Sequence, residues 1–178
     1  MLVPLLLGVE EHQALAVFTR RRADLRRHAG EISFPGGRRD PDDVDLRQTA
    51  LREAEEEIGL APDAVQLIGE LTPTSTFVTG YIIHPFVGLV PAAQRWRLSP
   101  LEVDEVIELP LSALRSGRTR TRMERRGISF ETDAYMVGEH LIWGATARIL
   151  DDLFARSEEL LDGRLSPPPD AGEQPVHG

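Results

Sequence analysis

The chain has no cysteine, no lysine and no asparagine among its 178 residues. Without cysteine it can form neither disulfides nor thiolate zinc sites, and it has no cysteine nucleophile. Without lysine it cannot carry out Schiff-base chemistry, and it lacks the lysine of a phosphate-binding Walker loop. All 20 of its lysine and arginine residues are therefore arginines.

Long hydrophobic runs are also missing. The longest apolar opening, residues 2–9, is far shorter than the about 20 residues that cross a bilayer. No basic residue precedes it, as one would in a signal peptide. The net charge of −9 argues against a general nucleic-acid-binding protein, which would present a basic face. We therefore expect a cytoplasmic protein without membrane or nucleic-acid partners.

The length of the chain favours one domain. We predict that this domain spans residues 1–165 and that a tail, residues 166–178, is disordered. The tail (SPPPDAGEQPVHG) has three consecutive prolines and no periodic apolar face, which is the composition of a disordered segment.

The apolar periodicity predicts several strands and two main helices. One helix spans residues 46–58, with Leu51, Ala54 and Ile58 on one face and Gly59 as its C-terminal stop. A hairpin is expected across Arg126-Gly127. The strands are expected at residues 14–20, 32–34, 65–72, 81–90, 103–109, 118–123 and 128–137, a turn or short helix at 112–116, and the second helix at 143–161.

Charge is unevenly distributed along the chain. Residues 1–37 and 111–128 are rich in arginine, and the segment 38–60 between them is acidic. A long anionic substrate that is held partly through a cation would suit this layout. The alternative is that these side chains form ion pairs on a solvated surface.

Three carboxylates lie close together on the first predicted helix. Glu53, Glu56 and Glu57 occupy positions i, i+3 and i+4, which places Glu53 beside the other two. Such a cluster repels itself unless a cation lies within it, and oxygen-only ligands suit a hard cation, Mg²⁺ or Mn²⁺. Arg52 precedes Glu56 by four residues and can pair with it. An acidic helix face taken alone is usually only solvated surface.

The order of residues around this cluster is more specific. The stretch resembles the Nudix box, G-x5-E-x7-R-E-U-x-E-E-x-G-U with U aliphatic. Gly37 corresponds to the first glycine, and residues 52–60 (REAEEEIGL) correspond to the second half. Between Gly37 and Arg52 there are 14 residues, one more than in the general pattern. The acid six residues after Gly37 is Asp43, and Asp45 competes for the role of the first glutamate.

The segment upstream of the box narrows the resemblance. Residues 18–37 (FTRRRADLRRHAGEISFPGG) are similar to the extended signature of the coenzyme A diphosphatase branch of the Nudix hydrolases. Residues 140–150 (HLIWGATARIL) are similar to the last helix of that branch. The matching positions of the signature are Leu25, Arg26, His28, Gly30, Glu31, Phe34, Pro35, Gly36 and Gly37.

The resemblance implies a fold, a reaction and a site. The fold is an α/β/α sandwich with a mixed sheet. The reaction is the Mg²⁺- or Mn²⁺-dependent hydrolysis of coenzyme A to 3′,5′-ADP and 4′-phosphopantetheine. The metal ligands are Glu53, Glu56 and Glu57, which act with Arg52 as the catalytic set. The substrate-binding residues are Arg26, Arg27, His28, Gly36 and Gly37.

Several alternatives stay open at this level. The same chemistry could act on ADP-ribose, NADH or another nucleoside diphosphate derivative, and a Nudix-like module could bind a ligand without catalysis. Glu56, Glu57 or Glu31 could be the general base. His28 could be structural, and Arg26 and Arg27 could be surface charges. For Trp143 and Phe130 a place in the core is favoured over stacking on adenine.

Overall fold

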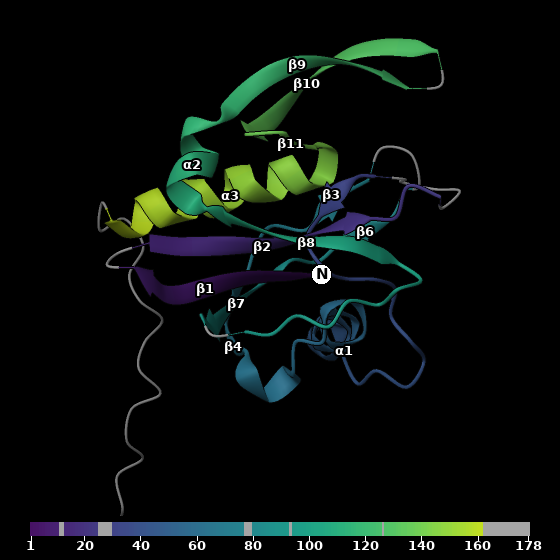
Figure 1. Ribbon diagram of the computed structural model, residues 1–178, viewed down its shortest axis with the longest axis vertical. Coiled ribbons are helices and arrows are strands. Elements are labelled where there is room, and N and C mark those ends of the chain that lie inside the picture. Colours follow the sequence, from purple (N-terminus) through teal and green to yellow (C-terminus); the bar gives the residue numbers. More distant parts are fainter. Residues whose placement is uncertain (11–12, 25–29, 77–79, 93, 126, 162–178) are drawn as a thin grey trace, which may run out of the picture.

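The computed structural model describes the chain except for residues 11–12, 25–29, 77–79, 93, 126 and 162–178 (Figure 1). The predicted tail, residues 166–178, lies outside the described residues, and so do Arg26, Arg27 and His28. Within the described residues, no helix is both long and apolar enough to cross a bilayer.

The body of the molecule is built on a mixed sheet of six strands. Its strand order is β3-β2-β1-β7-β4, and β8 pairs with β2 along the edge opposite to β1. The pair β1 and β7 is parallel and the other pairs are antiparallel, so the predicted mixed sheet is confirmed. The strands are β1 (Leu2–Glu10), β2 (Gln13–Arg21), β3 (Ile32–Ser33), β4 (Gln66–Glu70), β7 (Phe86–Pro91) and β8 (Val103–Pro110).

Helices cover both faces of this sheet. In Figure 1, α1 (Leu46–Ile58) lies below the sheet, and α2 (Leu111–Ser116) and α3 (Gly144–Leu161) lie above it. Successive side chains of a strand point to opposite faces. Leu2 and Leu6 of β1 therefore pack in the α1 core, whereas Val3 and Leu5 pack in the α3 core. The predicted α/β/α sandwich is confirmed.

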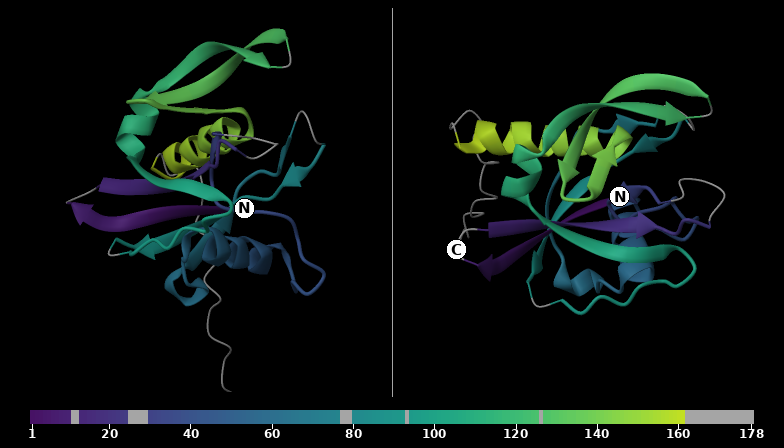
Figure 2. Two further views of the ribbon diagram at one scale, coloured as in Figure 1. Left: turned by 45° about the vertical axis from the view of Figure 1, so that its right-hand side comes forward. Right: turned by 45° about the horizontal axis from the view of Figure 1, so that its top comes forward.

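Smaller sheets complete the fold. The hairpin of β9 (Arg118–Arg125) and β10 (Ile128–Val137) was expected, and β11 (His140–Trp143) adds a third strand to it. Figure 2 shows this hairpin reaching out from the body beyond α3. The pair β5 (Thr74–Ser75) and β6 (Ile82–Ile83) forms a two-stranded sheet, and a short 3-10 helix spans Pro62–Ala64.

Three sequence-based expectations need correction. The predicted strand 81–90 is broken at His84-Pro85, because proline cannot donate to a ladder, and it forms β6 and β7 instead. The second helix begins at Gly144, and the segment before it is β11. No element was assigned to the apolar run at residues 2–9, which forms most of β1. Both faces of this strand are covered by helices, so its apolar residues do not alternate with polar ones.

Candidate active site

The helix that carries the acidic face begins and ends where the sequence predicted. The Asp45 side chain caps it by accepting the N–H of Gln48 at 2.8 Å. Gly59 ends it in the left-handed conformation, with a φ of 71°, and donates its N–H to the carbonyl of Glu55. The caps fix where α1 begins and ends. Its last two turns carry Glu53 and Glu57, which lie against Gly37 and Gly36.

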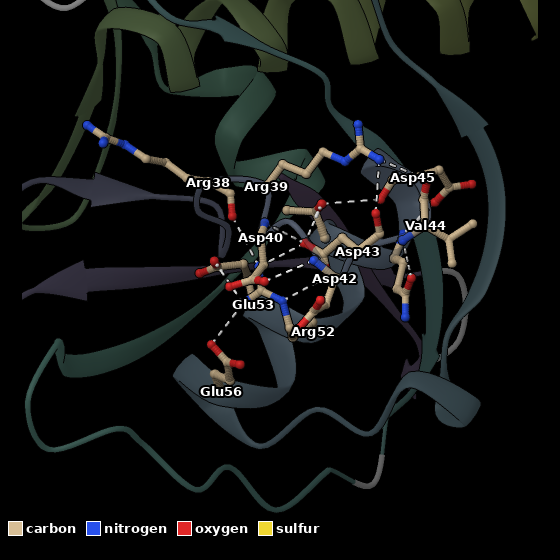
Figure 3. Close-up of polar contacts among 12 residues, drawn as sticks. Arg38, Arg39, Asp40, Asp42, Asp43, Val44, Asp45, Arg52, Glu53 and Glu56 are labelled. Atoms are coloured by element: carbon tan, nitrogen blue, oxygen red, sulfur yellow. Dashed lines mark hydrogen bonds and ion pairs between the residues drawn. The ribbon is translucent and has the colours of Figure 1, made fainter.

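Asp43 and Arg52 form the best-defined polar contact of the site (Figure 3). Asp43 is buried, and its two carboxylate oxygens accept from Nε and Nη2 of Arg52, both at 3.0 Å. The hydroxyl of Thr49 and the N–H of Asp40 also donate to Asp43. These donors, Arg52 above all, hold the pKa of Asp43 well below its usual range. The hydrogen bonds to Asp43 in turn raise the pKa of Arg52 above its usual value. Asp43 is thus the acid that positions Arg52, and Asp45 is a helix cap.

Arg52 in turn contacts two of the three clustered glutamates. Its Nη1 atom lies 3.1 Å from a carboxylate oxygen of Glu53 and 3.0 Å from one of Glu56. Its Nη2 atom donates to the carbonyl of Arg38 at 3.1 Å. The pairing of Arg52 with Glu56 that the sequence suggested is present. The guanidinium group ties helix α1 to the loop that follows Gly37.

Glu57 is the third member of the cluster and the most buried, with 8% of its surface exposed. The N–H of Gly36 donates to its carboxylate at 3.2 Å. Burial is the main cause that raises the pKa of Glu57 to about 7, and the negative charge of Glu53 adds to it. Burial also raises the pKa of Glu53, against the opposing effect of Arg52. The site thus contains two acids whose charge is poorly compensated.

The two glycines of the predicted site shape this place through their lack of side chains. A Cβ atom on Gly37 would overlap the carboxylate of Glu53. Gly36 has a φ of 152°, and a Cβ atom there would lie 2.6 Å from the Cα atom of Met1. A side chain at Gly37 would therefore displace the Glu53 carboxylate, and one at Gly36 would collide with the backbone of Met1.

The donor set suits a hard divalent cation. All candidate ligands are carboxylate oxygens, and a cation would stabilise the charged forms of the buried Glu57 and the partly buried Glu53. Among the described residues, no three acidic or histidine side chains already converge as a finished metal centre. Glu53 and Glu56 contact Arg52, and together with Glu57 they are the residues that would hold the cation.

Most arginines of the two arginine-rich segments form surface ion pairs, which was the alternative to binding an anionic substrate. Six of their described arginines form ion pairs with acids, which leaves less free cationic charge near the site than the sequence suggested. The pairs are Arg20–Glu105, Arg21–Glu102, Arg22–Asp24, Arg115–Glu158, Arg118–Asp151 and Arg120–Glu131.

Arg38 is a cationic residue at the site that the sequence analysis did not identify. Arg38 follows Gly37 directly, and its guanidinium carbon lies 4.6 Å from the centre of the Tyr81 ring. Figure 3 shows its side chain pointing away from the Asp43–Arg52 pair. Within the described part of the chain no acidic side chain pairs with it, so its N–H groups can meet an anion. Its position next to the glycine pair was the available signal.

The expectation that Phe130 belongs to the core is wrong. Phe130 is 36% exposed on β10, and its ring lies 6.3 Å from that of Trp143, which is itself only partly buried. Both residues belong to the three-stranded sheet, but the side chains by which this sheet joins a core are others, such as Tyr135 and Ile142.

Comparisons with known proteins agree with this geometry. A family model described as the NUDIX domain matches residues 3–128. The "Uncharacterized Nudix hydrolase NudL" of Photorhabdus laumondii is 42% identical over 139 residues, which are 77% of this chain and 74% of that protein. A protein with the same description from Salmonella paratyphi B is 42% identical over 147 residues, 82% of this chain and 76% of the relative.

Solved structures show the same fold at low identity. The Nudix hydrolase RenU of M. smegmatis has a TM-score of 0.58 at 12% identity, over 94% of this chain and 86% of RenU. The MutT protein of Methanosarcina mazei has a TM-score of 0.55 at 19% identity, over 90% of this chain and 92% of that one. At these identities the likeness concerns the architecture of the chain.

Proposed function

Because the chain belongs to the Nudix hydrolase family, we propose that it hydrolyses the diphosphate bond of coenzyme A and releases 3′,5′-ADP and 4′-phosphopantetheine. The observation that carries the hydrolytic part is the pair of the buried Glu57 and the partly buried Glu53, which lie one helical turn apart against Gly36 and Gly37. Keeping two such carboxylates together is costly, and a divalent cation bound between them would offset the cost and could also bind a diphosphate.

The roles of the residues follow from their contacts. A divalent cation held by Glu53, Glu56 and Glu57 would neutralise diphosphate charge and acidify a water molecule. Glu57 is close to half-protonated at neutral pH, since its pKa is about 7, and it must lose this proton to act as a ligand or base. Arg52, oriented by Asp43, holds the carboxylates of Glu53 and Glu56 in position. The glycine pair lets a phosphate approach the backbone.

The coenzyme A assignment is supported by residues 25–37, which carry the branch signature. Arg26, Arg27 and His28 stay predicted substrate-binding residues, because they lie outside the described residues. Arg38, held against Tyr81, is a further guanidinium group next to Gly37 that can contact a phosphate.

Two alternatives compete with this assignment. The same site could act on ADP-ribose, NADH or another nucleoside diphosphate derivative. A ligand-binding module without catalysis is disfavoured by the close pair Glu53 and Glu57, since a binding module has no need for two carboxylates that repel each other.

Mass analysis of the products tests the proposal. Purified protein is incubated with Mg²⁺ and, in parallel, with coenzyme A, dephospho-coenzyme A, ADP-ribose, NADH or a nucleoside triphosphate. We expect 3′,5′-ADP and 4′-phosphopantetheine from coenzyme A, and no turnover in EDTA. ADP-ribose as the clear best substrate would overturn the coenzyme A assignment and leave the hydrolase chemistry in place.

A further inference from the structure

A cavity of about 400 Å³ lies at the same end of the sheet as the acidic site, on the opposite face of the sheet. Strands β2 and β3 form one side of it, and β9 and β11 form the other. Arg20 and Arg21 are neighbours on β2 and point to opposite faces. Arg20 lines the cavity, whereas the charge of Arg21 acts on Glu57 and lowers its pKa. The cavity and the acidic site are therefore back to back across the end of β2.

A short stretch of chain connects the two places. Ile32 of β3 lines the cavity, and Gly36, four residues later, donates its N–H to Glu57. Four residues span at most about 14 Å even when fully extended. A flexible arm that leaves a diphosphate at Glu57 can therefore reach the cavity by following this segment.

Part of the cavity wall is apolar and aromatic. This part is formed by Ile32, Met123, Leu141 and Trp143. Met123 faces Phe130 across the β9–β10 ladder, and Phe130 contacts the ring of Trp143. Such walls suit a ligand group with an apolar body.

The acidic residues of the cavity disfavour a phosphate. Glu31, Glu124 and Glu139 line it, and Glu124 and Glu139 have no cationic partner within the described part of the chain. The guanidinium of Arg20 is already engaged, with Nε 2.9 Å from Glu105 and Nη2 2.9 Å from Nδ1 of His140. Carboxylates accept N–H and O–H donors and repel anions.

We propose that this cavity binds the uncharged pantetheine arm of the substrate. This inference rests on the proposed function. The two halves of coenzyme A differ in charge, because the adenosine half carries a 3′-phosphate and the pantetheine half is neutral, with amide N–H and hydroxyl donors and an apolar dimethyl group. An acidic cavity with apolar walls matches the second half and repels the first.

A pair of charge insertions on one strand tests the proposal. Met123→Glu places a carboxylate in the cavity. Thr121→Glu is the matched control, because Thr121 lies two residues away on the same face of β9 and does not line the cavity. We expect Met123→Glu to lower kcat/KM about 10-fold or more for both coenzyme A and dephospho-coenzyme A, and Thr121→Glu to change it less than about twofold.

Product inhibition shows which half is bound. Because Met123→Glu replaces part of the apolar wall with a hydrated charge, it is expected to raise the inhibition constant of 4′-phosphopantetheine about 10-fold and to leave that of 3′,5′-ADP unchanged. The opposite pattern would place the adenosine half in the cavity and overturn the proposal. Unchanged values for both products, in a protein that still hydrolyses coenzyme A, would also overturn it. Failure of the wild type to hydrolyse coenzyme A is a separate result that contradicts the proposed function.

A second variant does not depend on inserting charge next to the core. Glu124→Gln with Glu139→Gln changes two exposed side chains and keeps their size. We expect the wild type to cleave succinyl-coenzyme A about fivefold or more less efficiently than butanoyl-coenzyme A, because the succinyl group ends in a carboxylate, and the double variant to remove most of this difference. Equal efficiency of the wild type on the two thioesters would contradict an acidic arm-binding cavity.

Discussion

Arg52 reaches back nine residues to Asp43 and holds both of its carboxylate oxygens at 3.0 Å, although Asp45 lies nearer in the sequence. Asp45 is engaged at the start of the helix, where it accepts the N–H of Gln48. The two aspartates thus have different tasks. One orients the guanidinium group that contacts Glu53 and Glu56, and the other begins the helix that carries them.

Asparagine substitutions separate these tasks. Asp43→Asn removes a buried charge that faces Arg52, so we expect the melting temperature to fall by more than about 4 °C and kcat to fall at least about 10-fold. Asp45→Asn keeps a good N-cap, and its melting temperature should stay within about 2 °C of the wild type. Thermal unfolding and steady-state kinetics measure both. Equal damage from the two substitutions would contradict the assignment.

Glu57→Gln tests the buried carboxylate. It keeps the size of the side chain and removes a ligand charge, so we expect kcat to fall by on the order of 10²–10⁴-fold while the fold is retained. Glu55→Gln is the matched control, because Glu55 is exposed on the same helix and outside the cluster. Wild-type turnover in purified Glu57→Gln would rule out the metal-site interpretation.

The pKa of Glu57 predicts how stability depends on pH. Burial raises this pKa from 4.5 to about 7, so the folded chain binds the proton more tightly than the unfolded chain. Between pH 4.5 and pH 7 the wild type should therefore lose stability relative to Glu57→Gln, by roughly 3 kcal/mol in total. Thermal unfolding of both proteins in EDTA at a series of pH values measures this difference. Mg²⁺ should reduce it, and a difference that does not change with pH would contradict the burial argument.

Gly37 offers a test of the close approach between backbone and carboxylate. A methyl group there would overlap the mobile end of the Glu53 side chain, which can move aside at little cost in stability. We expect Gly37→Ala to lower kcat about 10-fold or more and to shift the melting temperature by less than about 3 °C. A Cβ atom on Gly69 would meet nothing within 4 Å, so Gly69→Ala is the control for the substitution itself.

Arg38 is expected to contribute to substrate binding rather than to the chemical step. Removal of a charge-assisted contact to phosphate by Arg38→Ala should raise KM about 10-fold with little change in kcat. Arg47→Ala is the control, because Arg47 is exposed on α1 and also has no acidic partner among the described residues. Similar KM values for the two variants would make Arg38 an ordinary surface charge.

The sequence by itself determined the elements whose signals are local. The helix Leu46–Ile58 was predicted with its observed bounds, because its cap, its apolar period and Gly59 all lie within a few residues of one another. The i, i+3, i+4 spacing of Glu53, Glu56 and Glu57 belongs to the same helix, so the candidate site and the family resemblance could be read before any contact was known.

Only the tertiary structure decided which residues meet across the chain. Glu57 accepts a hydrogen bond from the N–H of Gly36, 21 residues away. The contact of Arg20 with His140 joins residues 120 positions apart. The strand β11 forms because residues 140–143 find an edge of β10, a partner that no local propensity encodes. The choice of Asp43 over Asp45 and the cavity between two sheets likewise depend on how the elements pack, since burial and non-local pairing are set by the whole fold.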